Sequence, residues 1–146
     1  MRILMIHVDD FKCTVTEKGR SPVVEEPESE TIEMADGIVA LAAVEKADEA
    51  APEEVAAGAA KTIADHCRHL KAESLVLCSF SHLFAELGSA QVAVEILAAA
   101  GEELRTEGLA VQKTPFGWFN TFEMRAKGHP LSRVARVVTA AEGVAR

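Results

Sequence analysis

Aromatic residues and cysteines are scarce in this sequence, and tyrosine is absent. Phe and Trp make up 5% of the 146 residues, and the three cysteines, Cys13, Cys67 and Cys78, form no C-x-x-C pair. An odd cysteine count without paired spacing excludes a disulfide-stabilised scaffold and a paired-cysteine zinc site. We therefore expect a reduced, intracellular protein.

Long hydrophobic runs are also missing. The longest apolar stretches, residues 37–44 and 91–100, are much shorter than the roughly 20 residues needed to span a bilayer. The chain starts with Met1-Arg2-Ile3-Leu4, which is typical of a strand and not of a targeting segment. With 49% hydrophobic and 26% charged residues, the sequence predicts one soluble domain over residues 1–146, without a membrane partner.

The motifs of common hydrolases and nucleotide-binding enzymes are absent. The sequence has no nucleophile elbow, no Gly-rich phosphate loop and no H-E-x-x-H pair. His66 and His69 would share one helix face, but no third metal ligand accompanies them. We expect no metal and no cofactor, so an enzyme activity would come from a site without a signature motif.

Acidic residues outnumber basic ones, and the excess is unevenly distributed. The 23 Asp and Glu against 15 Lys and Arg give a net charge of −8. Residues 1–104 carry 8 basic and 20 acidic side chains, a balance of −12, whereas residues 105–146 carry 7 and 3, a balance of +4. Only the C-terminal third, with four basic residues between positions 125 and 136, could offer phosphates a favourable surface.

Hydrophobic periodicity predicts a mixed α/β domain. A β-hairpin opens the chain, with strands at residues 3–6 and 11–16 and a turn between them. Pro22 and Pro27 prevent a helix across residues 17–36, which we interpret as a long loop or an edge strand. The further strands are predicted at residues 37–44, 74–80, 109–113 and 121–126. The helices are predicted from Pro52 to about Lys71, from Ser89 to Leu104 and from Leu131 to about Glu142.

Two segments are candidates for a site. Ser79-Phe80-Ser81-His82 follows the carboxyl end of a buried strand, where α/β proteins commonly build their sites, so His82 is either a functional or a structural histidine. Residues 114–120 gather the only Trp and two of the six Phe residues beside a Gly and a Pro. Such a loop is equally typical of a ligand-binding wall and of a hairpin tip that closes one end of the core.

Several short segments together resemble one known family. They are residues 1–7, 44–48, 52–55, 80–83 with 86–87, 115–119 and 127–131. They occur in the family's order and near its spacing across almost the whole chain. In these segments the sequence resembles the N-terminal editing domain of archaeal threonyl-tRNA synthetases, which is related in fold to D-aminoacyl-tRNA deacylases.

The resemblance implies a fold and an activity. The fold would be a curved, mostly antiparallel sheet backed by two long helices, as in the D-aminoacyl-tRNA deacylases. The activity would be hydrolysis of serine wrongly esterified to threonine tRNA. A synthetic site rejects a substrate smaller by one methyl group by only about 1 to 3 kcal/mol, whereas a second site can exclude the larger threonine sterically.

The resemblance also implies a set of residues and partners. The substrate-binding walls would be Val44, Phe80, Ser81, Phe116, Gly117, Trp118 and Phe119, with Arg133 near the substrate amine. The catalytic residues would be His82, near the serine or the terminal adenosine, and Asn120, at the position that orders or activates the attacking water. The implied partners are aminoacyl-tRNA with its terminal adenosine, a second copy of the chain in a homodimer, and the rest of a synthetase in the cytoplasm.

Two of these positions depart from the family's pattern. Asn120 stands where the family carries a lysine that orders or activates the water, and Arg133 stands where it carries an acidic residue. Asparagine has no proton to exchange at neutral pH, but its amide can orient a water. Editing with altered groups, editing of a different aminoacyl group, and a catalytically silent tRNA-binding or dimerisation module stay open. An unrelated small-molecule binder is the alternative outside this family.

Overall fold

The chain is arranged around one long strand. The computed structural model describes residues 1–83, 86–140 and 143–144. The strands are β1 (Arg2–Lys18), β2 (Thr31–Ala43), β3 (Ser74–Ser79), β4 (Ala110–Lys113), β5 (Trp118–Ala126), β6 (Arg133–Thr139) and β7 (Gly143–Val144). The helices are α1 (Pro52–Leu70), α2 (Ala90–Thr106) and two short 3-10 helices, η1 (Lys46–Ala50) and η2 (Ser81–Leu83).

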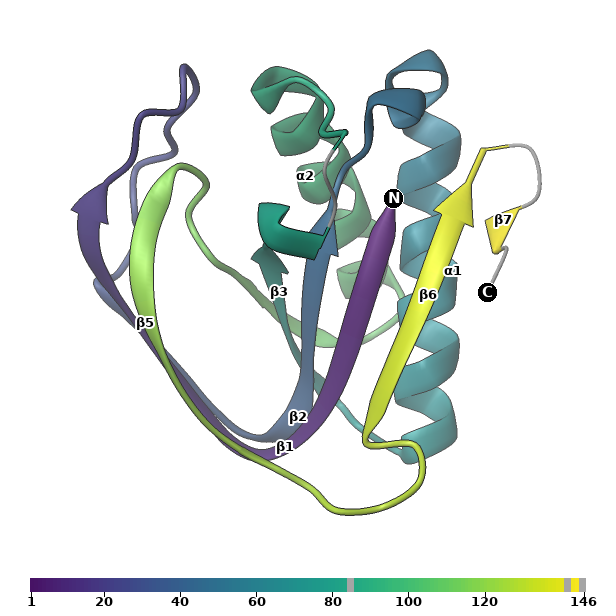
Figure 1. Ribbon diagram of the computed structural model, residues 1–146. Helices are drawn as coiled ribbons and strands as arrows, with labels where there is room; N and C mark the ends of the chain where they lie inside the picture. The colour runs from purple at the N-terminus through teal and green to yellow at the C-terminus, as the bar shows by residue number, and fades with distance from the viewer. Residues whose placement is uncertain (84–85, 141–142, 145–146) are drawn as a thin grey trace.

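The strand β1 lies at the centre of a curved sheet. In the described residues the strand order is β4-β3-β2-β1-β6-β7, and β5 also pairs with β1. β1 is antiparallel to β2, β5 and β6, whereas β2 with β3 and β3 with β4 are parallel pairs. Residues 2–6 of β1 pair with β6 and residues 8–18 pair with β5, so these two strands follow one another along the same edge. The expected curved, mostly antiparallel sheet is confirmed (Figure 1).

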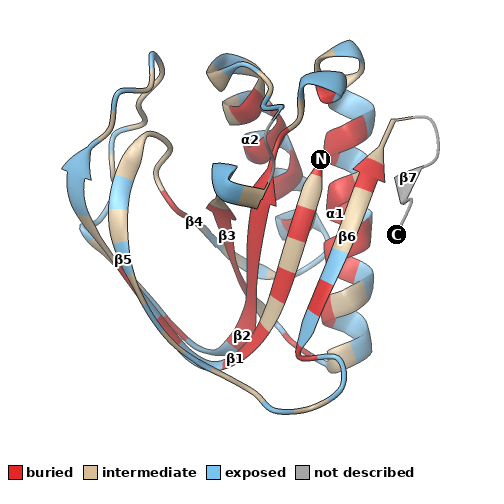
Figure 2. Ribbon diagram, in the orientation of Figure 1, coloured by how far each residue is buried: buried red, intermediate tan, exposed pale blue. Residues whose placement is uncertain are grey.

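The two long helices cover one face of this sheet (Figure 1). Pro52 is the first residue of α1, and Ser89 Oγ accepts a hydrogen bond from Val92 N at 3.3 Å at the start of α2. Both starts agree with the prediction. Proline suits the first helical position because an N–H there would have no partner within the helix, and a serine cap accepts a hydrogen bond from a free N–H of the first turn. The apolar sides of both helices form the main core with β1, β2 and β3, as the buried stripes in Figure 2 show. None of the helices in the described residues is long and apolar enough to span a bilayer.

The predicted opening hairpin is wrong. Residues 2–18 form one continuous strand that pairs with β2 along most of its length. The register with β5 shifts between Val8 and Asp10, so the chain bends at a bulge instead of reversing. Asp9 at this bend pairs with Lys127 at 2.6 Å, a contact between residues 118 positions apart that local patterning does not reveal. The predicted loop over residues 17–36 is accordingly shorter and covers residues 19–30.

The predicted C-terminal helix is also wrong. Its described part contains β6, and residues 141–142 lie outside the described residues. Val134, Val137 and Val138 have helical spacing, but β-branched residues also favour strands. The segment forms a strand because it pairs with β1, starting with Arg133 opposite Ile6. In this strand the two buried valines, Val134 and Val138, point to the same face of the sheet.

A second apolar cluster lies on the face of the sheet opposite the helices. Phe11 of β1 is buried, and its ring centroid lies 5.4 Å from that of Phe122 on β5. The Phe122 ring in turn lies 6.3 Å from Phe80, which follows β3. These aromatic contacts hold β5 beside the end of β3, although the two strands are not paired.

Two histidines join β1 to the connection between β5 and β6. Leu131 N donates to His129 Nδ1 at 3.2 Å, so the proton of the neutral His129 ring lies on Nε2. That Nε2 donates to His7 Nδ1 at 2.9 Å, which leaves the His7 proton on Nε2, 3.5 Å from Asp36 Oδ1. Protonation of His7 would place two N–H groups against each other. The contact therefore requires the neutral form of His7.

We expect the free energy of unfolding to fall as the pH drops below 6.5. Burial, with Lys127 and His129 nearby, lowers the pKa of His7 below its ordinary value of 6.5, so the unfolded chain binds the proton more readily. The stabilisation is complete above pH 6.5 and is lost below it, by at most about 1.4 kcal/mol per pH unit for one histidine. Urea unfolding between pH 7 and 5 should show a smaller pH dependence for His7→Gln. His69→Gln, at an exposed position, is the matched control, and equal slopes in all three proteins would contradict this account.

Candidate active site

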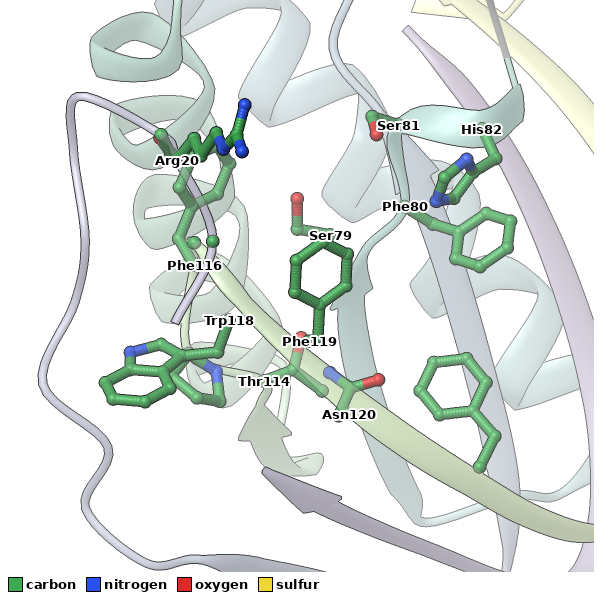
Figure 3. A pocket seen from close by; sticks show the side chains of 15 residues that line it. Arg20, Ser79, Phe80, Ser81, His82, Thr114, Phe116, Trp118, Phe119 and Asn120 are labelled. Carbon is green, nitrogen blue, oxygen red and sulfur yellow. The ribbon is translucent and has the colours of Figure 1, made fainter. Parts of the chain in front are cut away.

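A cavity of about 480 Å³ lies where the end of β3 meets the start of β5. Three stretches and Phe122 line it: residues 19–21 after β1, residues 79–82 at the end of β3, and residues 114–120, which comprise the connection after β4 and the first three residues of β5. The two segments selected from the sequence therefore meet in one cavity. Figure 3 shows Phe80 and His82 on one side of it and Phe116 and Trp118 on the other.

The end of β3 brings Ser81 and His82 to the cavity. Phe80 N donates to Ala42 O at 2.8 Å, and the chain then turns into η2. Ser81 and His82 are exposed there, and the His82 ring meets the edge of Phe80 at a centroid distance of 5.1 Å. Within the described part of the chain, the His82 ring nitrogens form no hydrogen bond and can therefore face a ligand or water.

Asn120 lies on a strand, and its position follows from strand periodicity. Burial alternates along β5, so Trp118, Asn120 and Phe122 point to the same side and line the cavity. Phe119 is 58% exposed and contributes to the rim. The sequence prediction started this strand at Thr121, three residues too late, because the preceding Pro and Gly indicate a loop.

Val44 belongs to a smaller, adjoining cavity. This cavity measures about 150 Å³ and shares Ser79, Ser81 and Phe116 with the main one. Val44 is buried directly after β2, and its carbonyl accepts a hydrogen bond from Gly88 N at 3.0 Å. The wall residues that the resemblance implied are thus divided between two cavities with a common wall.

Arg133 lies outside both cavities. It is the exposed first residue of β6 and pairs with Ile6 on the side of β1 away from β2 and β3. Within one copy of the chain, the structure therefore does not bring Arg133 together with the other candidate residues.

Sequence reasoning missed the segment that closes the cavity on the side of β1. We call residues 19–25 the strap and residues 114–117 the wall loop. Gly19, Arg20 and Ser21 of the strap line the main cavity. The available signal was Gly-Arg-Ser directly before Pro22, a composition typical of a turn, within a segment interpreted only as a loop.

Glycines allow the strap and the wall loop to approach each other closely. Gly19 N donates to Gly117 O at 2.7 Å, and a Cβ on Gly19 would lie only 2.9 Å from that oxygen. Gly117 has a φ of +91°, and a Cβ there would lie 3.0 Å from Val23 O. Only glycine satisfies both the backbone conformation and the close contact at position 117.

Glu25 joins the strap to the wall loop and to the residues on either side of that loop with four contacts. Its N–H donates to Phe116 O at 3.0 Å, and its Oε1 accepts from Phe116 N at 2.9 Å. Its carbonyl accepts from Trp118 Nε1 at 2.8 Å, and its Oε2 pairs with Lys113 Nζ at 2.9 Å. One carboxylate and its peptide groups thus fix the loop that forms one side of the cavity.

Glu25→Ala is expected to lower the free energy of unfolding by about 2 to 3 kcal/mol. Hydrogen bonds to charged groups contribute about 1.5 to 3 kcal/mol, and this change leaves the half-buried Phe116 N–H without its acceptor. Urea unfolding followed through Trp118, the single tryptophan, measures the loss. Glu26→Ala, at the exposed neighbouring position, should stay within about 0.5 kcal/mol of the unmodified protein. Equal losses in the two variants would show that Glu25 does not hold the loop.

The main cavity combines polar groups with aromatic walls. Its hydrogen-bonding side chains include four hydroxyls, the Asn120 amide and the His82 imidazole. Burial raises the pKa of Cys13 and of Cys67 to about 11, so both thiols stay protonated at neutral pH and are poor nucleophiles. In the described part of the chain, no group of three or more His, Cys, Asp or Glu is placed to hold a metal ion. The groups present can position a ligand and a water, and His82 can accept a proton.

Comparison with known structures gives the same fold. The c-Myc DNA Unwinding Element Binding Protein aligns with a TM-score of 0.62 and 12% sequence identity, over 92% of this chain and 97% of that one. At this identity the likeness shows the fold alone, and that fold is D-aminoacyl-tRNA deacylase-like, as the sequence resemblance implied.

Comparison of sequences reaches further. The chain is 42% identical over 144 residues to the threonine–tRNA ligase of Methanobrevibacter smithii, covering 97% of this chain and 23% of that protein. It is 40% identical over 139 residues to the enzyme of the same name from Methanopyrus kandleri, covering 95% and 22%. The chain thus spans less than a quarter of the length of these relatives. A family model described as the archaea-specific editing domain of threonyl-tRNA synthetase matches residues 1–138, so the chain belongs to that family of editing domains.

Proposed function

We propose that this editing domain hydrolyses serine that has been esterified to threonine tRNA by mistake. The observation that carries the proposal is the meeting of residues 79–82 and 114–120 in one cavity. The two segments are more than 30 residues apart in the chain, and each is a candidate from the sequence for a different reason, a strand end for the first and a cluster of aromatic residues for the second. Family membership supplies the substrate class, which is aminoacyl-tRNA.

The two adjoining cavities suit the two ends of such a substrate. In the proposal, the smaller cavity with Val44, Ser81 and Phe116 takes the aminoacyl group. The main cavity, with Trp118 on one side and Phe80 on the other, takes the terminal adenosine. A small cavity can reject threonine because the extra methyl group would clash with its wall. A synthetic site that accepts threonine cannot exclude serine in this way, because serine is smaller.

The proposed reaction is the addition of water to the ester carbonyl. The water oxygen bonds to the carbonyl carbon, the bond from that carbon to the ribose oxygen breaks, and the ribose oxygen takes up a proton. Serine and free tRNA are the products. His82 accepts the proton of the attacking water and the Asn120 amide positions that water, since both side chains line the main cavity.

Incubation of the chain with seryl-, threonyl- and alanyl-tRNA tests the proposal. We expect release of serine and not of threonine. Asn120, in place of the family's lysine, favours a second candidate, a catalytically silent tRNA-binding or dimerisation module of the same fold. This alternative predicts no release of any amino acid while uncharged tRNA still binds.

We also propose that two copies of the chain form a homodimer. Among the residues that the structure describes, three large apolar side chains are markedly exposed in the single chain: Leu87 at 42%, Phe119 at 58% and Leu131 at 38%. A second copy would cover part of this surface. Light scattering at micromolar concentration should give twice the mass of the 15.6 kDa chain, and a monomer mass would overturn this proposal. The further partners in the proposal are threonine tRNA and the rest of a synthetase, in the cytoplasm, with residues 1–146 acting as a single editing-type domain.

A further inference from the structure

The main cavity has an unusual charge for this chain. The sequence contains 23 Asp and Glu and has a net charge of −8, yet none of the described residues that line the cavity carries a carboxylate. Arg20 of the strap is the only Lys or Arg in the described lining. The cavity therefore offers a local positive charge on a domain whose net charge is negative.

The strap holds Arg20 at a fixed place on the cavity rim. On one side of it, Gly19 is bound to Gly117 O, and on the other side Glu25 is bound to the wall loop. Between them, Ser21 Oγ donates to Val23 O at 2.7 Å and accepts from Val23 N at 3.2 Å, which closes a tight turn. Arg20 is thus carried by a backbone that is tied to the cavity wall at both ends.

The Arg20 guanidinium is uncommitted within the described part of the chain. Arg68, Arg105 and Arg125 each pair with a carboxylate at 2.6 to 3.4 Å, whereas Arg20 forms no such pair and is exposed. Figure 3 shows its side chain extending from the strap toward the cavity. A free guanidinium with planar donors binds phosphate oxygens well, often through two parallel hydrogen bonds.

We propose that Arg20 binds a backbone phosphate of an RNA 3′ end at the mouth of the main cavity. This inference rests on the proposed function, since the nucleoside that carries the ester would occupy the cavity. The phosphodiester that precedes this nucleoside must then leave through the mouth, where Arg20 lies. The ligand class is a phosphodiester attached to a terminal adenosine, and not the nucleoside alone.

Binding of the uncharged trinucleotide CpCpA tests the proposal without any need for hydrolysis. For Arg20→Gln we expect about a tenfold weaker affinity, the loss of one charge-assisted contact. The slope of log affinity against log salt should also decrease by about 0.7, as for one phosphate on a single strand. Arg20→Lys should recover part of the affinity. Arg125→Gln is the matched control, because it removes the same charge from an 80% exposed side chain that lines no part of this cavity and pairs with Asp9.

The source of the phosphate is tested in the same assay. Adenosine, which has no phosphate, should bind Arg20→Gln and the unmodified protein equally. Millimolar inorganic phosphate should not displace CpCpA, and displacement would mean that the site takes free phosphate instead of RNA. Equal CpCpA binding by Arg20→Gln and the unmodified protein, or no CpCpA binding at all, would overturn the proposal.

Failure of this inference and failure of the proposed function are distinguishable. Arg20-dependent CpCpA binding without release of serine from seryl-tRNA would keep the phosphate contact and remove the hydrolytic function. Release of serine, together with CpCpA binding that Arg20→Gln does not change, would keep the hydrolytic function and remove the phosphate contact.

Discussion

Replacing Ser81 with phenylalanine is expected to slow hydrolysis of seryl-tRNA at least a thousandfold. Ser81 lines both the main and the smaller cavity, so a ring at this position occupies the volume that the proposal assigns to the serine ester. Without that volume the ester cannot reach a geometry in which water attacks its carbonyl. A thousandfold loss corresponds to about 4 kcal/mol in the activation free energy.

The Ser81→Phe variant should still fold, which keeps the result interpretable. Ser81 is exposed and its hydroxyl forms no hydrogen bond in the described part of the chain, so its replacement leaves no buried group without a partner. Urea unfolding through Trp118 checks this directly. Ser81→Ala, which leaves the cavities open, should stay within about tenfold of the original rate, since at most one hydrogen bond is lost. A Ser81→Phe protein that hydrolyses seryl-tRNA at near the original rate would show that the ester binds elsewhere.

Asn120→Ala is expected to reduce the rate by about tenfold and no more. A neutral amide can position a water but cannot take its proton, and one positioning hydrogen bond contributes about 1 to 1.5 kcal/mol. That free energy corresponds to roughly one decade in rate. The substitution removes no core packing, because Asn120 lies on the cavity side of β5.

Single-turnover deacylation measures the effect of Asn120→Ala without a contribution from product release. Thr121→Ala is a matched control on the same strand, since Thr121 is exposed and lines neither cavity. A thousandfold loss for Asn120→Ala would instead make the amide a principal catalytic group. The position that holds a lysine in the family would then be essential for catalysis in this chain too, although it holds an asparagine here.

The sequence predicted best where the deciding interactions are local. Pro52 and Ser89 start α1 and α2 as expected, because a helix start depends on groups within one turn. The buried runs that became β2 and β3 were recognised for a similar reason, since a run of apolar residues identifies a strand covered on both faces.

Two elements were predicted wrongly because distant pairing decides them. The valines of β6 have helical spacing, and only the pairing of that segment with the first residues of β1 makes it a strand. Asp9 and Asp10 have the composition of a turn, yet β1 continues through them with a bend. At this bend Asp9 forms an ion pair with Lys127, which lies more than 100 residues further along the chain. Neither interaction is visible in a window of neighbouring residues.

In the candidate site, too, the features that depend on neighbouring residues were predicted and those that depend on distant residues were not. Residues 79–82 and 114–120 were identified from strand ends and from the clustering of aromatic residues, and the structure brings them together. The strap was missed because its role depends on Glu25, whose partners lie 88 to 93 residues further along the chain. Arg133 was included on the resemblance alone, and within one copy of the chain it lies apart from the cavities.

The ratio of the single-turnover hydrolysis rates of seryl- and threonyl-tRNA, both carried on threonine tRNA, tests the central claim most directly. A cavity that accepts serine and rejects threonine by size predicts that the seryl ester is hydrolysed at least about a hundredfold faster, near the upper end of what one methyl group contributes. Equal rates for the two esters, or no hydrolysis of either one by a folded protein that still binds the tRNA, would contradict the account.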